Sequence, residues 1–186
     1  MIRLLSAVLI SVVVALPAQA LKVKDTEVAD TLTLNNQELV LNGAGVRSKF
    51  FVNAYVAALY LPAADQDANR IVAADEPMAI RLHITSGMIN AKRMSESTRD
   101  GFVRSTGGNT APIEKEIETL ISAFAEEVKE GDVFDMVYQP AAGVTVYRNG
   151  EAKTQVQGLH FKQALFGIWL SEDAIQSSLR KALVNS

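Results

Sequence analysis

A long run of apolar and aromatic positions, VNAYVAALYL, occupies residues 52–61. Nearly every position is apolar, and β-branched and aromatic residues are common, which is typical of a strand covered on both faces. The preceding residues 38–47, ELVLNGAGVR, predict a second strand. Its Gly43 and Gly45 leave room for a bulge, a bend or the close approach of another segment. The pattern therefore predicts two long consecutive strands.

Shorter strands are predicted where polar and apolar residues alternate or where apolar runs are bounded by turn residues. The strands expected on this basis cover residues 22–28, 31–34, 78–85, 133–138, 144–148 and 151–157. Asn149 and Gly150 both tolerate positive φ, so they predict a tight hairpin before the last of these strands.

Helical spacing predicts five helices. They are expected at residues 67–74, 90–105, from 110 or 112 to 130, from 159 to about 170, and from 171 or 172 to 184. In the second helix the inner stripe of Met94, Ser97 or Thr98, Gly101 and Phe102 is small and partly hydroxylated, so it packs closely or lines a cavity. The order of elements predicts an α+β domain with helices layered on one face of a large, mostly antiparallel sheet.

The first twenty residues are typical of an export leader. Arg3 gives a short basic region, Leu4–Leu16 is apolar, and Ala18-Gln19-Ala20 is a small-residue cleavage signature. The apolar run is shorter than the roughly 17 to 25 residues that span a bilayer, so a permanent anchor is the less favoured alternative. We expect cleavage after Ala20, one domain at residues 21–186, a periplasmic location in a Gram-negative cell, and no stable membrane anchor after cleavage.

The composition of the chain excludes several kinds of site and partner. There is no cysteine, which excludes disulfides, thiolate metal sites and a lipid-modified N-terminal cysteine. The formal net charge of −3 offers no electrostatic case for nucleic acid or an anionic membrane as partner. His83 and His160 stand far apart without the spacing of a metal site. We therefore expect no metal and no cofactor.

Two segments resemble the chalcone isomerase-like superfamily, in its exported bacterial branch rather than its plant flavonoid enzymes. They are LNGAGVRSKFFVNAYVAALYL at residues 41–61 and GLHFKQALFGIWL at residues 158–170. The resemblance implies an open-faced β-sandwich, in which helices pack on a large sheet and a ligand cleft opens between the two layers.

The resemblance also implies a carboxylate site. In fatty-acid-binding members, an arginine after the glycine pair and a tyrosine in the next strand hold the ligand carboxylate, and these positions correspond to Arg47 and Tyr55. A guanidinium offers a bidentate fork, and a phenol adds one donor. Along one unbroken strand the two residues would lie about 26 Å apart, so the chain must fold back near Ser48 or Lys49. A buried hairpin with an arginine at its exposed end is the plainer alternative.

The catalytic positions of the plant enzymes are not retained. Tyr55 stands where they carry a threonine, and Asn90, Arg93 and Ser97 stand at the helix positions, of which Arg93 keeps a positive charge. We therefore do not expect flavanone formation, and we add Arg93 to the expected ligand-binding residues.

Three functions remain open. The favoured one is binding of a small amphipathic carboxylate, such as a fatty acid, by Arg47, Tyr55 and Arg93, without catalysis. An alternative is an isomerase or lyase in which Arg47 polarises a carbonyl and Tyr55 relays a proton. The third is an envelope interaction protein without a small ligand.

The leader gives a first test. Because Pro17 ends the apolar region and Ala18 and Ala20 satisfy the small-residue rule, N-terminal sequencing of exported protein should begin at Leu21. Recovery of the intact N-terminus in a membrane fraction would contradict cleavage.

Overall fold

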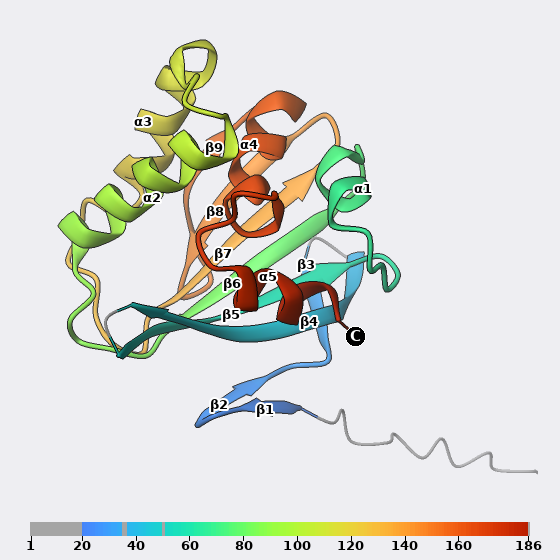
Figure 1. Ribbon diagram of the computed structural model, residues 1–186, viewed down its shortest axis with the longest axis vertical. Helices are drawn as coiled ribbons and strands as arrows, with labels where there is room; N and C mark the ends of the chain where they lie inside the picture. Colours follow the sequence, from blue (N-terminus) through green and yellow to red (C-terminus); the bar gives the residue numbers. More distant parts are fainter. Residues whose placement is uncertain (1–19, 35–36, 50, 186) are drawn as a thin grey trace, which may run out of the picture.

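The computed structural model describes residues 20–34, 37–49 and 51–185 (Figure 1). The expected leader therefore lies outside the described residues except for Ala20. Within the described ranges, no helix is both long enough and apolar enough to cross a membrane.

The main sheet has seven strands in the order β3-β4-β5-β6-β7-β8-β9, so every strand pairs antiparallel with its neighbour in sequence. Its strands are β3 Thr31–Leu34, β4 Gln37–Lys49, β5 Val52–Leu61, β6 Met78–Ile84, β7 Val133–Gln139, β8 Gly143–Arg148 and β9 Glu151–Val156. A separate two-stranded hairpin consists of β1 Leu21–Val23 and β2 Thr26–Val28.

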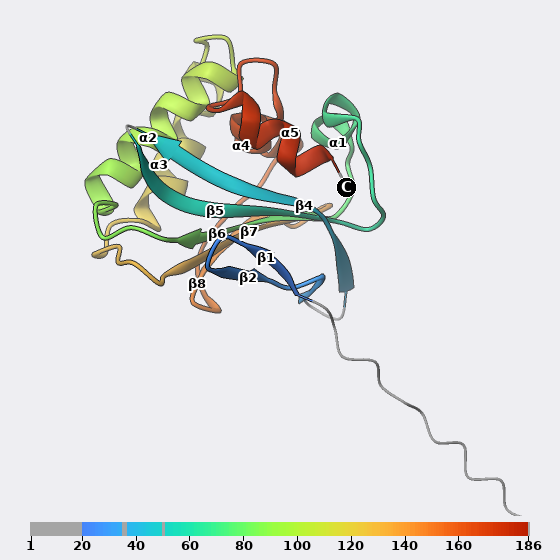
Figure 2. The ribbon, with the colours of Figure 1, turned by 60° about the horizontal axis from the view of Figure 1, so that its bottom comes forward.

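The helices gather on one face of the main sheet, and the β1–β2 hairpin lies against the other face (Figure 2). They are α1 Ala68–Ala73, α2 Ala91–Ser105, a 3₁₀ turn η1 Ala111–Ile113, α3 Glu114–Ser122, α4 Leu159–Leu170 and α5 Ser177–Val184. This arrangement confirms the expected α+β fold class, a large antiparallel sheet with helices on one face.

The larger core lies between the sheet and the helices. β5 contributes alternate residues to the cores on the two faces, which explains why its sequence is apolar at nearly every position. α4 is buried almost all round, from Phe161 to Leu170 with the exception of Gln163. A helix that is apolar on all sides packs in the interior of a domain.

The two glycines of β4 allow α5 to lie directly on the strand. A Cβ atom at Gly43 would stand 2.3 Å from the carbonyl oxygen of Ala182, and one at Gly45 would stand 2.8 Å from the Cβ of Ala182. Both distances are too short for any side chain. A register shift between Leu41 and Gly43 adds a bulge at the same place. The expected close approach and the expected bulge therefore both occur.

The third predicted helix is shorter than expected. α3 ends at Ser122 instead of continuing to residue 130, although Phe124 and Val128 are buried as the spacing predicted. The following backbone is held by buried polar groups. Arg148 donates to the carbonyl oxygen of Glu127, and Asp132 accepts from the backbone N–H of Lys129 at 2.8 Å. These tertiary bonds replace the hydrogen bonds of a longer helix.

Two other boundaries were also wrong. The strand expected at residues 22–28 is broken by a turn in which Lys24 has a φ of 53°, and its halves pair with each other. The last helix begins at Ser177 rather than at Ser171 or the residue after it. Ser171 instead ends α4, where its N–H donates to the carbonyl oxygen of Gly167 at 3.0 Å. Both errors arise where pairing and packing override local pattern.

One buried cation joins α4 to α1. The side chain of Lys162 is 0% exposed, and its Nζ donates to the carbonyl oxygens of Ile71, Val72 and Ala74 at 3.0, 2.9 and 2.6 Å. These carbonyls close the C-terminal end of α1, where a helix leaves acceptors unsatisfied and favours positive charge. Burial lowers the pKa of Lys162 to about 8, and the acidic Asp75 nearby opposes the shift.

Replacing Lys162 with methionine should lower the free energy of unfolding by about 2 kcal/mol at pH 7, because three carbonyl groups lose their donor. Chemical denaturation followed by circular dichroism measures the change. An unchanged free energy of unfolding would show that water satisfies these carbonyls equally well.

The free energy of unfolding should depend on pH differently in the wild type and in Lys162→Met. The folded state holds the neutral amine more readily than the unfolded chain, since the pKa falls from 10.5 to about 8 on folding. Stability is therefore gained as the pH rises above about 8. Between pH 7 and 9.5 the wild type should gain about 2 kcal/mol relative to Lys162→Met.

Candidate functional site

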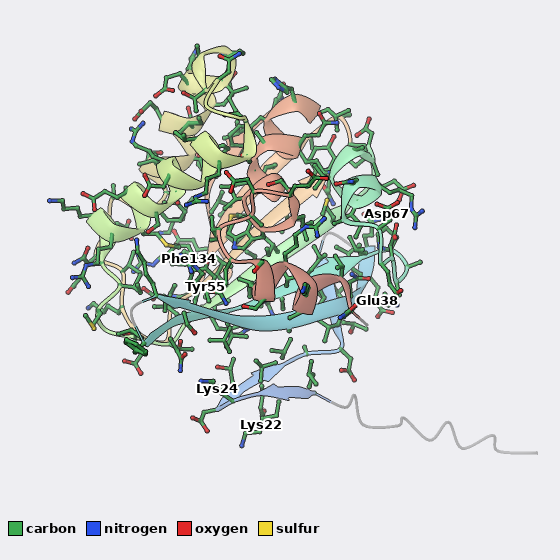
Figure 3. The ribbon with its side chains drawn as sticks, viewed as in Figure 1. Lys22, Lys24, Glu38, Tyr55, Asp67 and Phe134 are labelled. Atoms are coloured by element: carbon green, nitrogen blue, oxygen red, sulfur yellow. The ribbon has the colours of Figure 1, made fainter. Side chains whose placement is uncertain are left out.

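Arg47 and Tyr55 face each other across the β4–β5 hairpin. The register pairs Arg47 directly with Tyr55, and the chain turns between Lys49 and Val52. Facing residues of an antiparallel pair project to the same side of the sheet with their Cβ atoms roughly 5 Å apart. The fold-back required by the spacing of the two residues is therefore present. Tyr55 lies in the helix-side core, as does Phe134 (Figure 3).

The phenol of Tyr55 is oriented by α4. Its side chain is 8% exposed, and its oxygen accepts a hydrogen bond from the indole Nε1 of Trp169 at 3.0 Å. Burial raises the pKa of Tyr55 to about 12, although this bond and the charge of Arg47 act in the opposite direction. The phenol therefore stays protonated near neutral pH, and its O–H remains a potential donor to a ligand oxygen.

The guanidinium of Arg47 is held by the segment that precedes α5. Its Nη1 donates to the side-chain Oε1 of Gln176 at 3.0 Å and to the carbonyl oxygen of Ser48 at 2.8 Å. The same Oε1 accepts from the N–H of Ser48 at 2.9 Å, and Nε2 of Gln176 donates to the carbonyl oxygen of Val46 at 3.0 Å. Gln176 thus fixes both the strand and the guanidinium with an uncharged side chain.

An outer cleft of about 190 Å³ opens beside this pair. Arg47 and Tyr55 line its sheet side, while Arg93 and Asp100 line its side on α2. A second hollow of about 350 Å³ continues from it toward the β4–β5 turn, where it is also lined by Arg93 and Asp100 and by Met88. All three residues that the sequence suggested as ligand-binding residues therefore stand around one opening.

A small apolar pocket lies behind the outer cleft. Its walls come from the sheet, α2, the end of α3 and α4, and they include Leu82, Met94, Leu120, Phe124, Met136, Leu165, Ile168 and Trp169. Four residues line both spaces and form the neck between them: Tyr55, Met94, Ser97 and Ile175. The free volume of the inner pocket is about 30 Å³, roughly the volume of one water molecule in the liquid.

Positive charge predominates at the outer cleft. Arg47, Lys49, Arg93 and Arg104 line it, and Asp100 is the one acidic residue among its lining residues. Arg104 is paired with Asp173 at 3.0 Å. Arg47 and Arg93 bond to carbonyl or amide oxygens, and neither makes an ion pair with any carboxylate of the part of the chain that the structure describes. Two guanidinium groups can therefore bind an incoming anion.

The α2 positions that correspond to plant catalytic residues have other roles here. The side chain of Asn90 caps α2 by accepting from the N–H of Arg93 at 3.0 Å. The guanidinium of Arg93 donates to the carbonyl oxygen of Met88 at 2.7 Å, and Ser97 lies at the neck. No three acidic or histidine side chains meet in a possible metal site within residues 20–34, 37–49 and 51–185.

Sequence reasoning missed the residues that support the pair. Gln176 falls inside the last helix that the sequence predicts, and Trp169 is not among the expected site residues. Trp169 is indeed buried, but its N–H is bonded to the candidate site. Its place in the FGIWL segment was a usable signal, whereas nothing local marks Gln176. That Arg47, Tyr55 and Arg93 bind a ligand stays a prediction.

The antiparallel sheet, the helices on one of its faces and the cation-lined cleft between them describe an α+β domain with a candidate binding site. The chain belongs to the chalcone isomerase-like family, whose model matches residues 20–185. Among solved structures, it is similar to a fatty-acid binding protein of Arabidopsis thaliana, with a TM-score of 0.70 and 15% identity over 90% of this chain and 96% of that chain. At this identity the likeness shows the fold. A search of curated proteins finds no match.

Gln176 allows the charge of the site to be tested without touching Arg47. Gln176→Glu should place a carboxylate on the guanidinium and lower affinity for a carboxylate ligand by about tenfold, since it satisfies the cation internally. Gln176→Ala is the uncharged control, because it removes all the side-chain hydrogen bonds of Gln176 without adding charge. Isothermal calorimetry with octanoate compares the three proteins. Equal affinities for the two variants would contradict the role of charge.

Proposed function

We propose that this protein binds a small amphipathic carboxylate, such as a fatty acid, in the cleft between its sheet and helices. The observation that carries the proposal is the pairing of Arg47 with Tyr55 across the β4–β5 hairpin, at the mouth of an apolar pocket. Arg47 makes no ion pair within the described ranges, and its guanidinium and the protonated phenol of Tyr55 suit the two oxygens of a carboxylate. The apolar neck behind them suits a hydrocarbon tail.

The similarity in fold to a fatty-acid binding protein supports the same ligand class. The small inner pocket sets the position of the tail. With about 30 Å³ free behind the neck, most of a tail must lie along the outer cleft and the adjoining hollow. Flexible Met94 and Met136 side chains line the inner pocket and allow some repacking around the first methylenes.

We further propose that the protein works in the periplasm as a member of the exported bacterial branch of the family. The leader pattern of residues 1–20 supports this location. The first strand begins at Leu21, directly after the expected cleavage site. Removal of the leader would therefore leave every strand and helix of the described fold intact.

Catalysis is the second candidate. Arg47 could polarise a carbonyl while the phenol of Tyr55 donates a proton, and the hydrogen bond from Trp169 supports that orientation. The raised pKa of about 12 disfavours a phenolate, so Tyr55 would act poorly as a base near neutral pH. Binding without turnover is therefore the function we favour.

Calorimetry over straight-chain acids of increasing length separates these functions. For a binder, each added methylene should raise the affinity by about fourfold until the cleft is full, and the series should then level off. Arg47→Ala should lower the affinity for every acid by about tenfold to a hundredfold without changing the melting curve. Arg47→Lys should restore part of the lost affinity.

A parallel absorbance assay with chalcone tests the catalytic alternative. An isomerase would show turnover that falls far more in Tyr55→Phe than substrate affinity does. A flat length series together with Tyr55-dependent conversion would overturn binding as the function. Absence of both binding and conversion would favour an envelope interaction protein.

A further inference from the structure

Phe51 is an aromatic residue that is exposed to solvent and has a positive φ. It lies in the two-residue turn between β4 and β5, its side chain is 108% exposed, and its φ is 65°. A bulky residue in the left-handed region carries a steric cost that glycine or asparagine avoids. Because Phe51 is fully exposed, packing against the described part of the chain does not offset this cost. A function outside the folded domain would explain the residue.

A tight hairpin elsewhere in the same sheet provides an internal comparison. Between β8 and β9 the turn residues are Asn149 and Gly150, with φ values of 51° and 82°. These are the residue types that such turns favour. The chain therefore uses favoured turn residues in this hairpin, whereas Phe51, like Lys24 and Ala141, has a positive φ without being glycine or asparagine.

A second exposed apolar side chain lies at the same end of the molecule. Met88, 52% exposed, belongs to the segment between β6 and α2. That segment is fastened to the start of β5, since Thr85 donates through its N–H to Ala54 and through its hydroxyl to Asn53, both at 3.1 Å. The β4–β5 turn and this segment lie at one end of the sheet in both views (Figures 1 and 2).

Basic side chains surround this end. Lys49 precedes the turn, and Lys92 and Arg93 begin α2 directly after the Met88 segment. Glu130, whose carboxylate accepts from the N–H of Gly87 at 3.1 Å, is the acidic residue in contact with the segment. Glu96 lies one turn further along α2 and pairs with Lys92 at 3.8 Å. Lys49 and Arg93 are the basic residues that line the hollow beside Met88, and the acidic Glu96 and Asp100 line it with them.

We propose that Phe51 and Met88 form a docking tip that inserts into the interface of a phospholipid bilayer with anionic headgroups. Exposed aromatic and aliphatic side chains flanked by lysine and arginine are the combination that binds such interfaces. The tip is continuous with the site, because Lys49, Met88 and Arg93 line the hollow that leads into the outer cleft. Docking would bring the cleft mouth against the source of an amphipathic acid. The proposal goes beyond acid binding and does not require it.

Vesicle co-sedimentation without added acid tests the tip. Residues 21–186 contain every strand and helix described, and they omit the apolar Leu4–Leu16 stretch, which would itself partition into lipid. The protein should bind vesicles of phosphatidylcholine and phosphatidylglycerol, and Phe51→Asn should bind about tenfold more weakly. Asparagine suits the left-handed turn position, so the melting temperature should not fall.

Two further variants serve as a control for exposed apolar side chains and as a fluorescent probe of insertion. Val103→Gln removes an apolar side chain that is 50% exposed near the far end of α2, and it should bind vesicles like the wild type. Phe51→Trp should retain binding and show a blue-shifted emission with lipid that brominated lipids quench, since the indole would enter the interface.

Failure of the wild type to bind vesicles, or equal binding by Phe51→Asn, would overturn the proposal. Self-association that is lost in Phe51→Asn, in the absence of vesicle binding, would overturn it in favour of a second copy of the chain as partner. Phe51 does not line the cleft, so acid binding measured without vesicles tests the proposed function separately.

Discussion

The burial of α4 is the constraint on which the rest of the structure depends. A helix that is apolar on nearly all sides must be covered on all sides, and the sheet, α1, α2 and the segment leading to α5 supply that cover. The closeness is visible at Gly101 of α2, where a Cβ atom would stand 2.7 Å from Ile168. At the end of α4 the carbonyl oxygen of Ile168 accepts from the N–H of Ile175 at 3.0 Å. Each surrounding element is therefore positioned by its contact with this one helix.

The candidate site follows from the same packing. Trp169 comes from the last turn of α4 and reaches the phenol of Tyr55, while the chain that leaves α4 brings Gln176 to Arg47. The two residues on the sheet are thus each oriented by groups that α4 places. The cleft opens where α4 stops covering the sheet, and Ile175 there lines both the outer cleft and the inner pocket.

Lys162 and Arg47 differ in burial, and this difference decides which of the two can bind a ligand. Lys162 is enclosed and donates to three carbonyl oxygens, so its N–H groups are used in holding α1. Arg47 is only partly buried, and its described hydrogen bonds go to neutral oxygens from one of its terminal nitrogens. A guanidinium has five N–H donors, so most of its hydrogen-bonding capacity remains for an anion. Of the two positive groups, Arg47 is the one able to take a ligand.

The sequence by itself determined the elements whose local pattern agrees with their tertiary setting. The limits of α4, the acid-capped α1, the buried β5 and the Asn149–Gly150 hairpin were all predictable, because periodicity and turn chemistry act over a few neighbouring residues. The tertiary structure alone decided the end of α3, the start of α5 and the hydrogen bonds that orient Arg47 and Tyr55. Those features depend on partners distant in sequence, such as Arg148 for the α3 end and Gln176 for the strand. Hydrogen bonds between distant segments leave no periodic trace, so the roles of Gln176 and Trp169 became visible only in the folded structure.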